Sequence, residues 1–295
     1  MILRVFPSRT NATPTDDYAL SPSKINRWSA YPSPLGMDPP GVTEVHVSVT
    51  FSWDLPEAER LRSAWAERGY PVLLGGPAVG MRGEEFTPGR YLKPGYVITS
   101  RGCPNNCWFC SVPKREGREI RELPIANGWN VLDDNLLACS QEHIRRVFEM
   151  LRRQKERIYF TGGMEAKRLQ LWHVELFKSV RPKEIFFAYD TPDDWEPLAE
   201  ACRMFFHARY GSRNIVRSYV LVGYPGDTIK DADWRCRRVQ ALSVTPMAMP
   251  YQNPQWTLEQ VEEQRRKWRK FTSAWSRPAA IWALDRDFSY LREVV

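Results

Sequence analysis

The chain of 295 residues contains no apolar run near the roughly 18 to 20 residues that a membrane-spanning helix requires. Its first residues, MILRVFPSRT, lack the apolar stretch of a secretory leader, and the chain has no long repeat and no low-complexity tract. These absences exclude membrane-spanning and repeat-array proteins. We expect a cytoplasmic protein with no membrane partner.

Acidic residues are outnumbered, with 35 Asp and Glu against 42 Lys and Arg, and the formal net charge is +7. This moderate positive bias is compatible with a polyanionic partner such as nucleic acid, but it mainly informs solubility and encounter rate. Hydrophobic residues make up 43% and charged residues 26% of the chain, as in folded globular proteins. The length corresponds to about two domains of about 150 residues, or to one barrel with an added piece.

The N-terminal part, residues 1–92, is predicted to hold one βαβ unit and an irregular segment. The alternation in EVHVSVTF, residues 44–51, indicates a strand, and a capping-box pattern at Asp54 and Glu57 begins a helix. A second strand follows from Pro71 to Leu74, so this small Rossmann-like unit should be parallel. The stretch from residue 7 to residue 40 holds seven prolines and is predicted to be irregular.

From residue 93 to residue 255, strands alternate with amphipathic helices. Six strands are predicted, at residues 96–100, 130–132, 158–160, 184–188, 216–222 and 244–249. Repeated strand–helix units indicate an α/β fold, here a partial (βα)6 TIM-like barrel with its active site at the carboxyl ends of the strands. A C-terminal helical extension is predicted for residues 256–295. Its helix begins at Thr257 and has an apolar seam of Leu258, Val261, Trp268, Phe271 and Trp275.

The six cysteines do not indicate a disulfide framework, because thiols in a cytoplasmic protein stay reduced. Cys103, Cys107 and Cys110 lie in VITSRGCPNNCWFCSV, directly after a predicted strand. Their spacing lets one short loop present three thiolates to a compact iron–sulfur cluster, whereas most such clusters take four cysteines. One iron would then be open to a small chelating molecule. A zinc site is the weaker alternative, because no second cysteine pair and no histidine lies nearby.

The remaining cysteines are predicted to be ordinary thiols. Cys202 and Cys236 lie on the apolar faces of their helices and are expected in the core. Cys139 follows a strand end and is also expected to be a buried thiol, with an approach to the site as the alternative.

The spacing Cys103-x3-Cys107-x2-Cys110, with Phe109 before the third cysteine, resembles the signature of the radical S-adenosylmethionine superfamily. The resemblance covers residues 96 to about 250. It implies a [4Fe-4S] cluster that reductively cleaves S-adenosylmethionine to a 5'-deoxyadenosyl radical, which abstracts hydrogen from a substrate. It also implies an external electron donor of the flavodoxin or ferredoxin kind.

Within that superfamily, RGCPNNCWFC, VLDDN and LVGYPGD are similar to the cobalamin-dependent and methylthiotransferase-like branch. The chain before the cysteines is too short for a whole cobalamin domain and has no Asp-x-His-x-x-Gly, so cobalamin is not predicted. The stretch from Lys114 to Gly128 also lacks a convincing first barrel helix.

Residues at the strand ends are the candidates for holding S-adenosylmethionine. The resemblance implies an acidic group for the cofactor's ammonium, which is either Asp133 or Asp134, or the pair Gly162 and Gly163 with Glu165. Asp190 is the candidate that would bind the ribose hydroxyls. Gly223 would let the chain pass along the adenine, or is simply part of a turn. Phe109 would stack on the adenine or shield the cluster.

The aromatic and basic composition bears on the class of substrate. Twelve Trp, twelve Tyr and thirteen Phe with many arginines would suit a nucleic acid or nucleotide, although core packing is the commoner use of aromatics. A peptide or small metabolite is the second hypothesis. A non-enzymatic, metal-stabilised nucleic-acid-binding protein is the alternative from another class.

Overall fold

The computed structural model describes residues 1–23, 29–208, 215–253 and 255–284. The protein is a mixed α/β structure with two parallel sheets and one short antiparallel strand pair. Residues 285–295 of the predicted C-terminal extension lie outside the described part of the chain. No helix in the described residues is long and apolar enough to cross a bilayer.

The N-terminal sheet has four parallel strands in the order β2-β1-β3-β4. The expected unit is present as β3 (Glu44–Ser48), α1 (Leu55–Glu67) and β4 (Val72–Gly75), with Leu61 and Trp65 of the helix fully buried against the sheet. The strands β1 (Ile2–Val5) and β2 (Ala19–Leu20) were not predicted. They are too short for a periodic signal, and they form because β1 pairs with β3 along its whole length.

The larger sheet contains all six strands predicted for residues 93–255, in the spatial order β12-β11-β10-β9-β8-β5. Every neighbouring pair is parallel. The strands are β5 (Tyr96–Val97), β8 (Asn130–Val131), β9 (Tyr159–Met164), β10 (Glu184–Tyr189), β11 (Val216–Val222) and β12 (Thr245–Pro250). Consecutive strands therefore lie side by side and their carboxyl ends share one edge.

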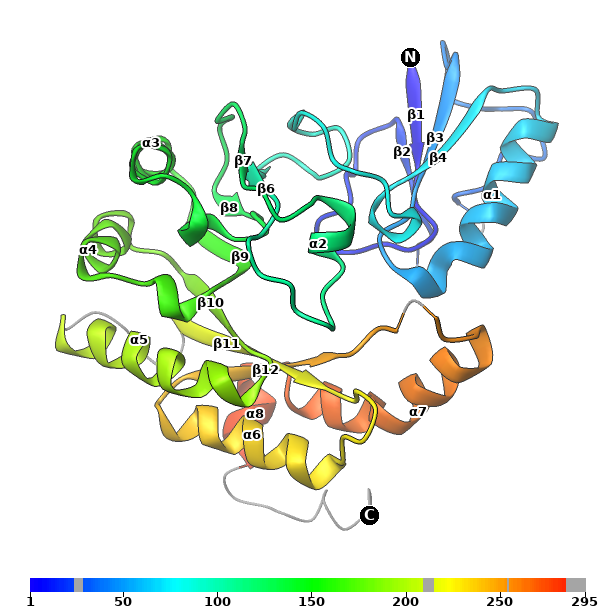
Figure 1. The fold of residues 1–295 in the computed structure, drawn as a ribbon. Coiled ribbons are helices and arrows are strands. Elements are labelled where there is room, and N and C mark those ends of the chain that lie inside the picture. The colour runs from blue at the N-terminus through cyan, green and yellow to red at the C-terminus, as the bar shows by residue number, and fades with distance from the viewer. Residues whose placement is uncertain (24–28, 209–214, 254, 285–295) are drawn as a thin grey trace.

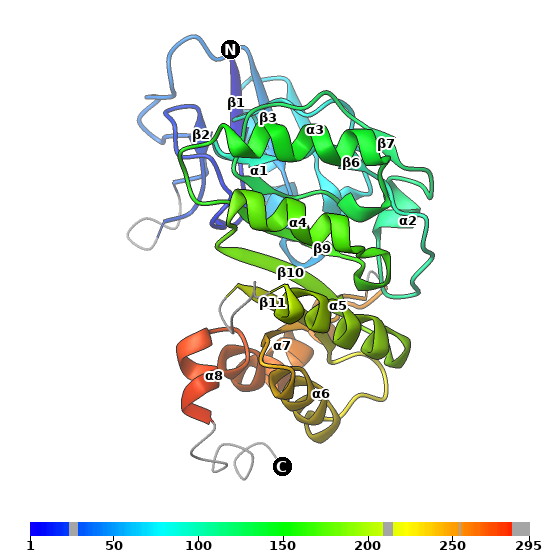
Figure 2. The same ribbon diagram turned by 90° about the vertical axis from the view of Figure 1, so that its left-hand side faces the viewer.

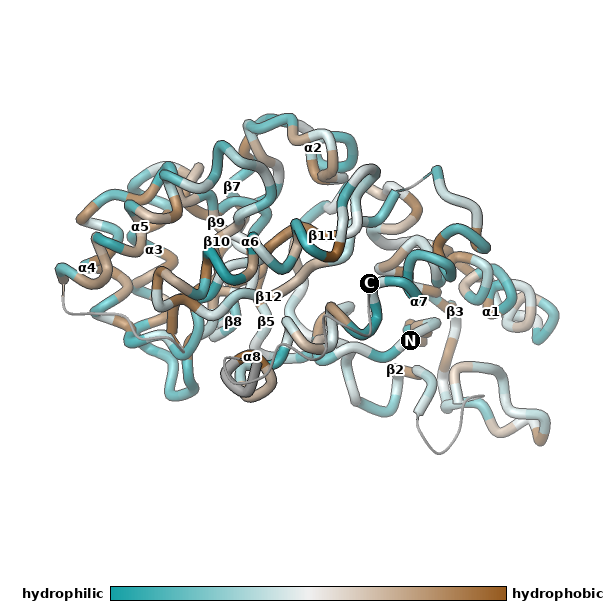
Figure 3. The backbone as a smooth tube through the Cα atoms, turned by 90° about the horizontal axis from the view of Figure 1, so that it is seen from below, coloured by the Kyte–Doolittle hydropathy of each residue, from teal (hydrophilic) through white to brown (hydrophobic). Residues whose placement is uncertain are grey.

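Four helices cover one face of this sheet, as Figures 1 and 2 show. They are α3 (Gln141–Arg152), α4 (Leu171–Val180), α5 (Trp195–His207) and α6 (Ile229–Ala241). Short 3-10 turns occur at Ser52–Asp54, Pro77–Val79, Leu136–Ala138, Ala166–Arg168 and Pro192–Asp194. The predicted core thiols Cys202 and Cys236 are confirmed as buried in this layer. Figure 3 shows apolar segments gathered around the strands and polar turns toward the outside.

The first strand–helix unit departs from the pattern. The predicted strand at residues 96–100 divides into β5 and β6 (Ser100–Arg101), because the Thr99 N–H leaves the sheet and donates to Asp133 at 2.6 Å. β6 instead pairs antiparallel with β7 (Arg121–Glu122). Only the four-residue helix α2 (Val112–Arg115) lies between them, as the lack of a helical pattern there predicts.

The C-terminal helix α7 (Leu258–Ala274) begins after a capping box of Thr257 and Gln260, which confirms its predicted start. Trp268, Phe271 and Trp275 of the predicted seam are buried, but Leu258 is 51% exposed, so the seam does not extend to the first turn. The helix ends against the large sheet, where the Ala248 N–H donates to the Trp275 carbonyl at 3.0 Å. A short helix, α8 (Pro278–Leu284), follows it.

Replacement of Trp275 tests whether α7 is part of the folded core. Its ring is fully buried and its Nε1 donates to Asp233 at 3.2 Å, so Trp275→Ala should lower the free energy of unfolding by about 3–5 kcal/mol. The control is Trp234→Ala, because Trp234 is 57% exposed and loses at most a surface contact of about 1 kcal/mol. Urea unfolding measures both. Equal losses would mean that α7 does not depend on this seam.

Candidate functional site

The cysteine loop, residues 102–111, runs across the carboxyl ends of the large sheet and meets the strands in order. At its start, the Gly102 N–H donates to Asp134, which follows β8, at 2.9 Å. Asn105 then hydrogen-bonds Glu165, which follows β9. At its far end, the Trp108 ring contacts Tyr224 after β11 and Tyr251 after β12, with centroids 5.8 and 5.4 Å away. The loop therefore lies where ligands bind in parallel sheets.

The three thiols of this loop are partly exposed, and Cys103 and Cys110 lie near enough to Cys107 to influence its ionisation. The Cys110 N–H donates to the Cys107 carbonyl at 3.1 Å, which folds the chain back between them. Burial raises the pKa of Cys107 to about 11, and the neighbouring Cys110 and Cys103 thiols add to the effect. Burial raises the pKa of Cys110 as well. A nearby cation, such as a metal or a cluster, would favour the ionised forms of Cys107 and Cys110.

Asn135 is a site residue that the sequence analysis did not assign. It is 2% exposed, and its Nδ2 donates to Glu165 at 2.8 Å and contacts Cys103 Sγ at 3.5 Å. Its buried Oδ1 has no hydrogen-bond partner among the described residues. An unsatisfied buried acceptor beside the cysteines is an expected place for a ligand donor. The only sequence signal was its position at the end of VLDDN.

Glu165 is already surrounded by cations. Its oxygens lie 2.7 Å from Lys167 Nζ and 2.5 Å from Arg168 Nε. Burial alone would raise the pKa of Glu165, but the hydrogen bonds from Lys167, Asn135 and Arg168 outweigh it and lower the pKa to about 2. The carboxylate therefore stays ionised and joins the cysteine loop to β9.

The two aspartates that follow β8 take different positions. Asp133 is turned into the protein and accepts hydrogen bonds from the Thr99 and Ser100 hydroxyls at 2.6 and 2.8 Å. Burial raises the pKa of Asp133 to about 6 although these bonds oppose the shift. Asp134 faces the cysteine loop, where it accepts from Gly102 and lies 3.7 Å from Arg115. Of the two, only Asp134 contacts the loop.

The glycines of the Thr161-Gly162-Gly163 segment serve different purposes. A Cβ on Gly162 would lie 2.3 Å from the Asp133 carbonyl oxygen, so the close approach of β9 to β8 requires glycine there. A Cβ on Gly163 would meet only the Tyr219 ring at 3.4 Å. Gly162 is thus a packing requirement, whereas a side chain at Gly163 would make only an ordinary contact with Tyr219.

Three further candidates lie around the loop. Asp190 follows β10 and is an electrostatic neighbour of Cys107 and Cys110. Gly223 follows β11 with φ of 78°, and a Cβ there would lie 3.0 Å from the Trp268 ring, so it is required for a turn and a close approach. Phe109 is partly buried and packs edge-on against Trp108.

A buried carboxylate anchors the far side of the loop. Glu116 is 2% exposed and pairs with Arg101, Arg115 and Arg121. It also accepts the Gly83 N–H at 3.1 Å, which ties the N-terminal extension to the end of the cysteine loop. Nothing in the local sequence marked Glu116, because its partners come from three separate segments.

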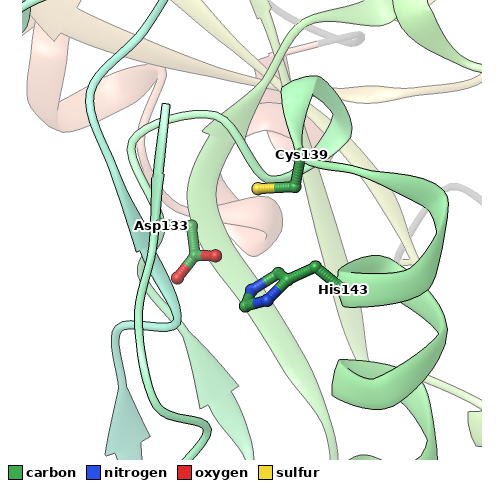
Figure 4. A group of neighbouring side chains, drawn as sticks. All are labelled: Asp133, Cys139 and His143. Atoms are coloured by element: carbon green, nitrogen blue, oxygen red, sulfur yellow. The ribbon is translucent and has the colours of Figure 1, made fainter. Parts of the chain in front are cut away.

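A second group of potential metal ligands lies behind the loop. Asp133, Cys139 and His143 point toward one another, with ligand atoms within 4.8 Å (Figure 4). Their atoms are already engaged, since Asp133 accepts from Thr99 and Ser100 and His143 Nε2 lies 3.2 Å from the Thr99 hydroxyl. Burial raises the pKa of the Cys139 thiol to about 12. Asp133 and His143 therefore already have hydrogen-bond partners at Thr99 and Ser100.

No family model matches the chain, and no curated protein matches it significantly. The assignment of the site therefore depends on its own geometry.

Substitution of the adjacent glycines tests the contact between β8 and β9. Gly162→Ala should lower the free energy of unfolding by about 1–3 kcal/mol, because the new methyl overlaps the Asp133 carbonyl. Gly163→Ala is the matched control and should be nearly neutral, because its methyl reaches only ordinary contact distance. Urea unfolding of both variants measures this, and a larger loss for Gly163→Ala would contradict the assigned packing.

The pH dependence of stability tests the environment of Asp190. Burial and the nearby Asp194 raise the pKa of Asp190 from 3.8 to about 7, so the folded state binds the proton more tightly than the unfolded state. The free energy of unfolding should therefore fall as the pH rises through this window. Asp190→Asn should weaken that fall in the metal-free protein, whereas the exposed Asp193→Asn should leave it unchanged. Unfolding at about pH 5 and about pH 8 measures the difference. An unchanged dependence in Asp190→Asn would refute the assigned burial.

Proposed function

We propose that this protein is a radical S-adenosylmethionine enzyme whose [4Fe-4S] cluster is held by Cys103, Cys107 and Cys110. The proposal is supported by the path of the cysteine loop, which carries three electrostatically coupled thiols along the carboxyl ends of a parallel sheet. Three cysteines leave one iron of a cubane cluster without a protein sulfur. The six-stranded sheet would correspond to the partial barrel of that superfamily.

The donor set fits the group. The three thiols are partly exposed, and the buried Asn135 Oδ1 beside them offers an acceptor that no described residue uses. When bound, the cluster would supply the electron that cleaves S-adenosylmethionine and releases the hydrogen-abstracting 5'-deoxyadenosyl radical. The protein would hold, orient and shield the reacting groups.

For the cofactor's ammonium group, buried oxygen atoms without a hydrogen-bond partner are better candidates than oxygen atoms that are already paired. Asp133 is occupied by Thr99 and Ser100, whereas Asn135 Oδ1 and, apart from its ion pair with Lys167, Glu165 Oε1 are buried acceptors without a hydrogen-bond partner among the described residues. The cofactor's ammonium would therefore be held by the Asn135 carboxamide oxygen together with the Glu165 carboxylate, with Asp134 positioning the loop. Asp190 would accept from the ribose hydroxyls, and Gly163 would let the cofactor approach the strand end.

The edge of the site is aromatic on the side of β11 and β12. Trp108 is 56% exposed and, with Phe109, Tyr224 and Tyr251, forms a wall next to Cys107. These rings would shield the radical from water, and Phe109 and the turn at Gly223 would border the adenine. The electron would come from an external flavodoxin- or ferredoxin-like donor. No cobalamin is proposed.

The substrate class that we propose first is a nucleic acid or nucleotide, with a peptide or small metabolite second. The positive charge of the chain and the exposed aromatic wall favour the first. A non-enzymatic protein stabilised by zinc is the competing hypothesis, and the group of Asp133, Cys139 and His143 is the alternative place for its metal.

Replacement of one cluster cysteine distinguishes the radical enzyme from the zinc-stabilised protein. After anaerobic reconstitution with iron and sulfide, the parent protein should release 5'-deoxyadenosine from S-adenosylmethionine once reductant is added. Cys107→Ala should lose both the cluster absorption and this product, because two thiolates do not hold the cluster. Cys139→Ala is the matched control and should keep both.

Two results would reject the proposal. One is continued release of 5'-deoxyadenosine by Cys107→Ala. The other is a colourless protein that carries zinc, retains it in Cys107→Ala and loses it in Cys139→Ala.

A further inference from the structure

A large cavity lies beside the cysteine loop, between α7, the ends of β11 and β12, and the segment before α1. Its volume is about 520 Å³, which is in the range of small-molecule sites. Its walls combine four aromatic rings with three cations: Trp53, Tyr251, Trp256, Trp268, Arg265, Arg266 and Arg269. Glu262 is the one acidic residue in the lining, so the cavity is positively charged.

Buried contacts fix the position of α7, which forms one wall of the cavity. Trp268 of α7 is 3% exposed and presses against the Gly223 backbone, and Phe271 behind it is fully buried. These contacts fix the helix against the end of β11. The arginines on the same helix therefore stand at set positions along the cavity.

Two of the three cations have no acidic partner in the described part of the chain. Arg265 lies over the Trp53 ring, 5.4 Å from its centroid, and is an electrostatic neighbour of Asp54. Arg266 and Arg269 are exposed and form no ion pair with any described residue. Guanidinium groups of this kind suit the paired oxygens of a phosphate.

The aromatic walls lead toward the cysteine loop. Trp256 packs edge-on against Tyr251 at 5.6 Å, and Tyr251 in turn contacts Trp108, the neighbour of Cys107, at 5.4 Å. Gln252 and Asn253 also line the cavity, and Asn253 Oδ1 accepts the Gln255 N–H at 2.9 Å. A nucleotide matches this lining. Its base can stack on the aromatic rings and pair with amides, and its phosphate can bind the arginines.

We infer that this cavity binds a nucleotide unit of the substrate, with the base against Trp256 and Tyr251 and the phosphate on Arg265, Arg266 and Arg269. This inference deepens the proposed function and rests on it for the statement that the ligand is a substrate. The unit comes from a single-stranded nucleic acid or from a free nucleotide, which offer the same chemistry.

Binding of a short fluorescently labelled single-stranded RNA to the full-length protein tests the site without requiring a cluster. The variant Arg266→Ala/Arg269→Ala removes two phosphate contacts, so the slope of log affinity against log salt should fall by about 1.4. Trp256→Ala should weaken binding about tenfold and Trp256→Phe should restore most of it, because the phenyl ring still stacks. The matched control Arg152→Ala/Arg203→Ala removes two exposed arginines from α3 and α5 and should leave the affinity unchanged.

Competitors identify the source of the nucleotide. Displacement of the labelled RNA by adenosine monophosphate, and not by inorganic phosphate, indicates a free nucleotide. Displacement by unlabelled RNA alone indicates a strand. The inference is overturned if the control variant loses as much affinity as the cavity variants, if poly-glutamate competes as well as RNA, or if no RNA or nucleotide binds.

The cleavage of S-adenosylmethionine separates this inference from the proposed function. The reconstituted cavity variants should still release 5'-deoxyadenosine in the absence of substrate, since they leave the cysteine loop intact. A protein that binds RNA through the cavity but never cleaves S-adenosylmethionine would reject the enzyme assignment and leave the nucleotide site standing.

Discussion

The central constraint on this structure is that one loop must stay stretched across the ends of several parallel strands. A loop rich in polar backbone groups is costly to order, so each part of it needs a partner. Asp134 accepts from Gly102, Asn135 and Glu165 hold the segment around Cys103 and Asn105, and the rings after β11 and β12 receive Trp108. The thiols are consequently positioned by the sheet rather than by their own short segment.

The electrostatics of the same edge favour a bound cation. Burial raises the pKa of Cys107, Cys110 and Asp190, so without a positive centre these groups favour their protonated forms. A metal would reverse that preference and release protons on binding. By contrast, Asp133 and His143 both hydrogen-bond the Thr99 hydroxyl, and the Glu116 carboxylate is matched by three arginines. These two groups hold the loop from behind and from its far end.

The C-terminal helix completes the site from the other side. α7 is anchored by Trp268, Phe271 and Trp275, and its exposed arginines border the cavity that continues from the aromatic wall. The N-terminal extension contributes Trp53 to this cavity and Gly83 to the anchoring of Glu116. Segments distant in the sequence thus converge on the carboxyl edge of one sheet, as is usual for ligand sites of parallel α/β proteins.

The sequence by itself determined the α/β class, the six strands of the large sheet, the start of α7 and the crowding of three cysteines after a strand. These features are local, because strand alternation, capping boxes and cysteine spacing are written in neighbouring residues. Only the tertiary structure decided that β1 and β2 join the first sheet, that Asp133 turns inward while Asn135 faces Cys103, and that Gly162 is required by the Asp133 carbonyl. Which way a polar side chain faces depends on partners that come from distant segments, such as Thr99 for Asp133 and Glu165 for Asn135. No local pattern records those partners, since folding alone brings them together.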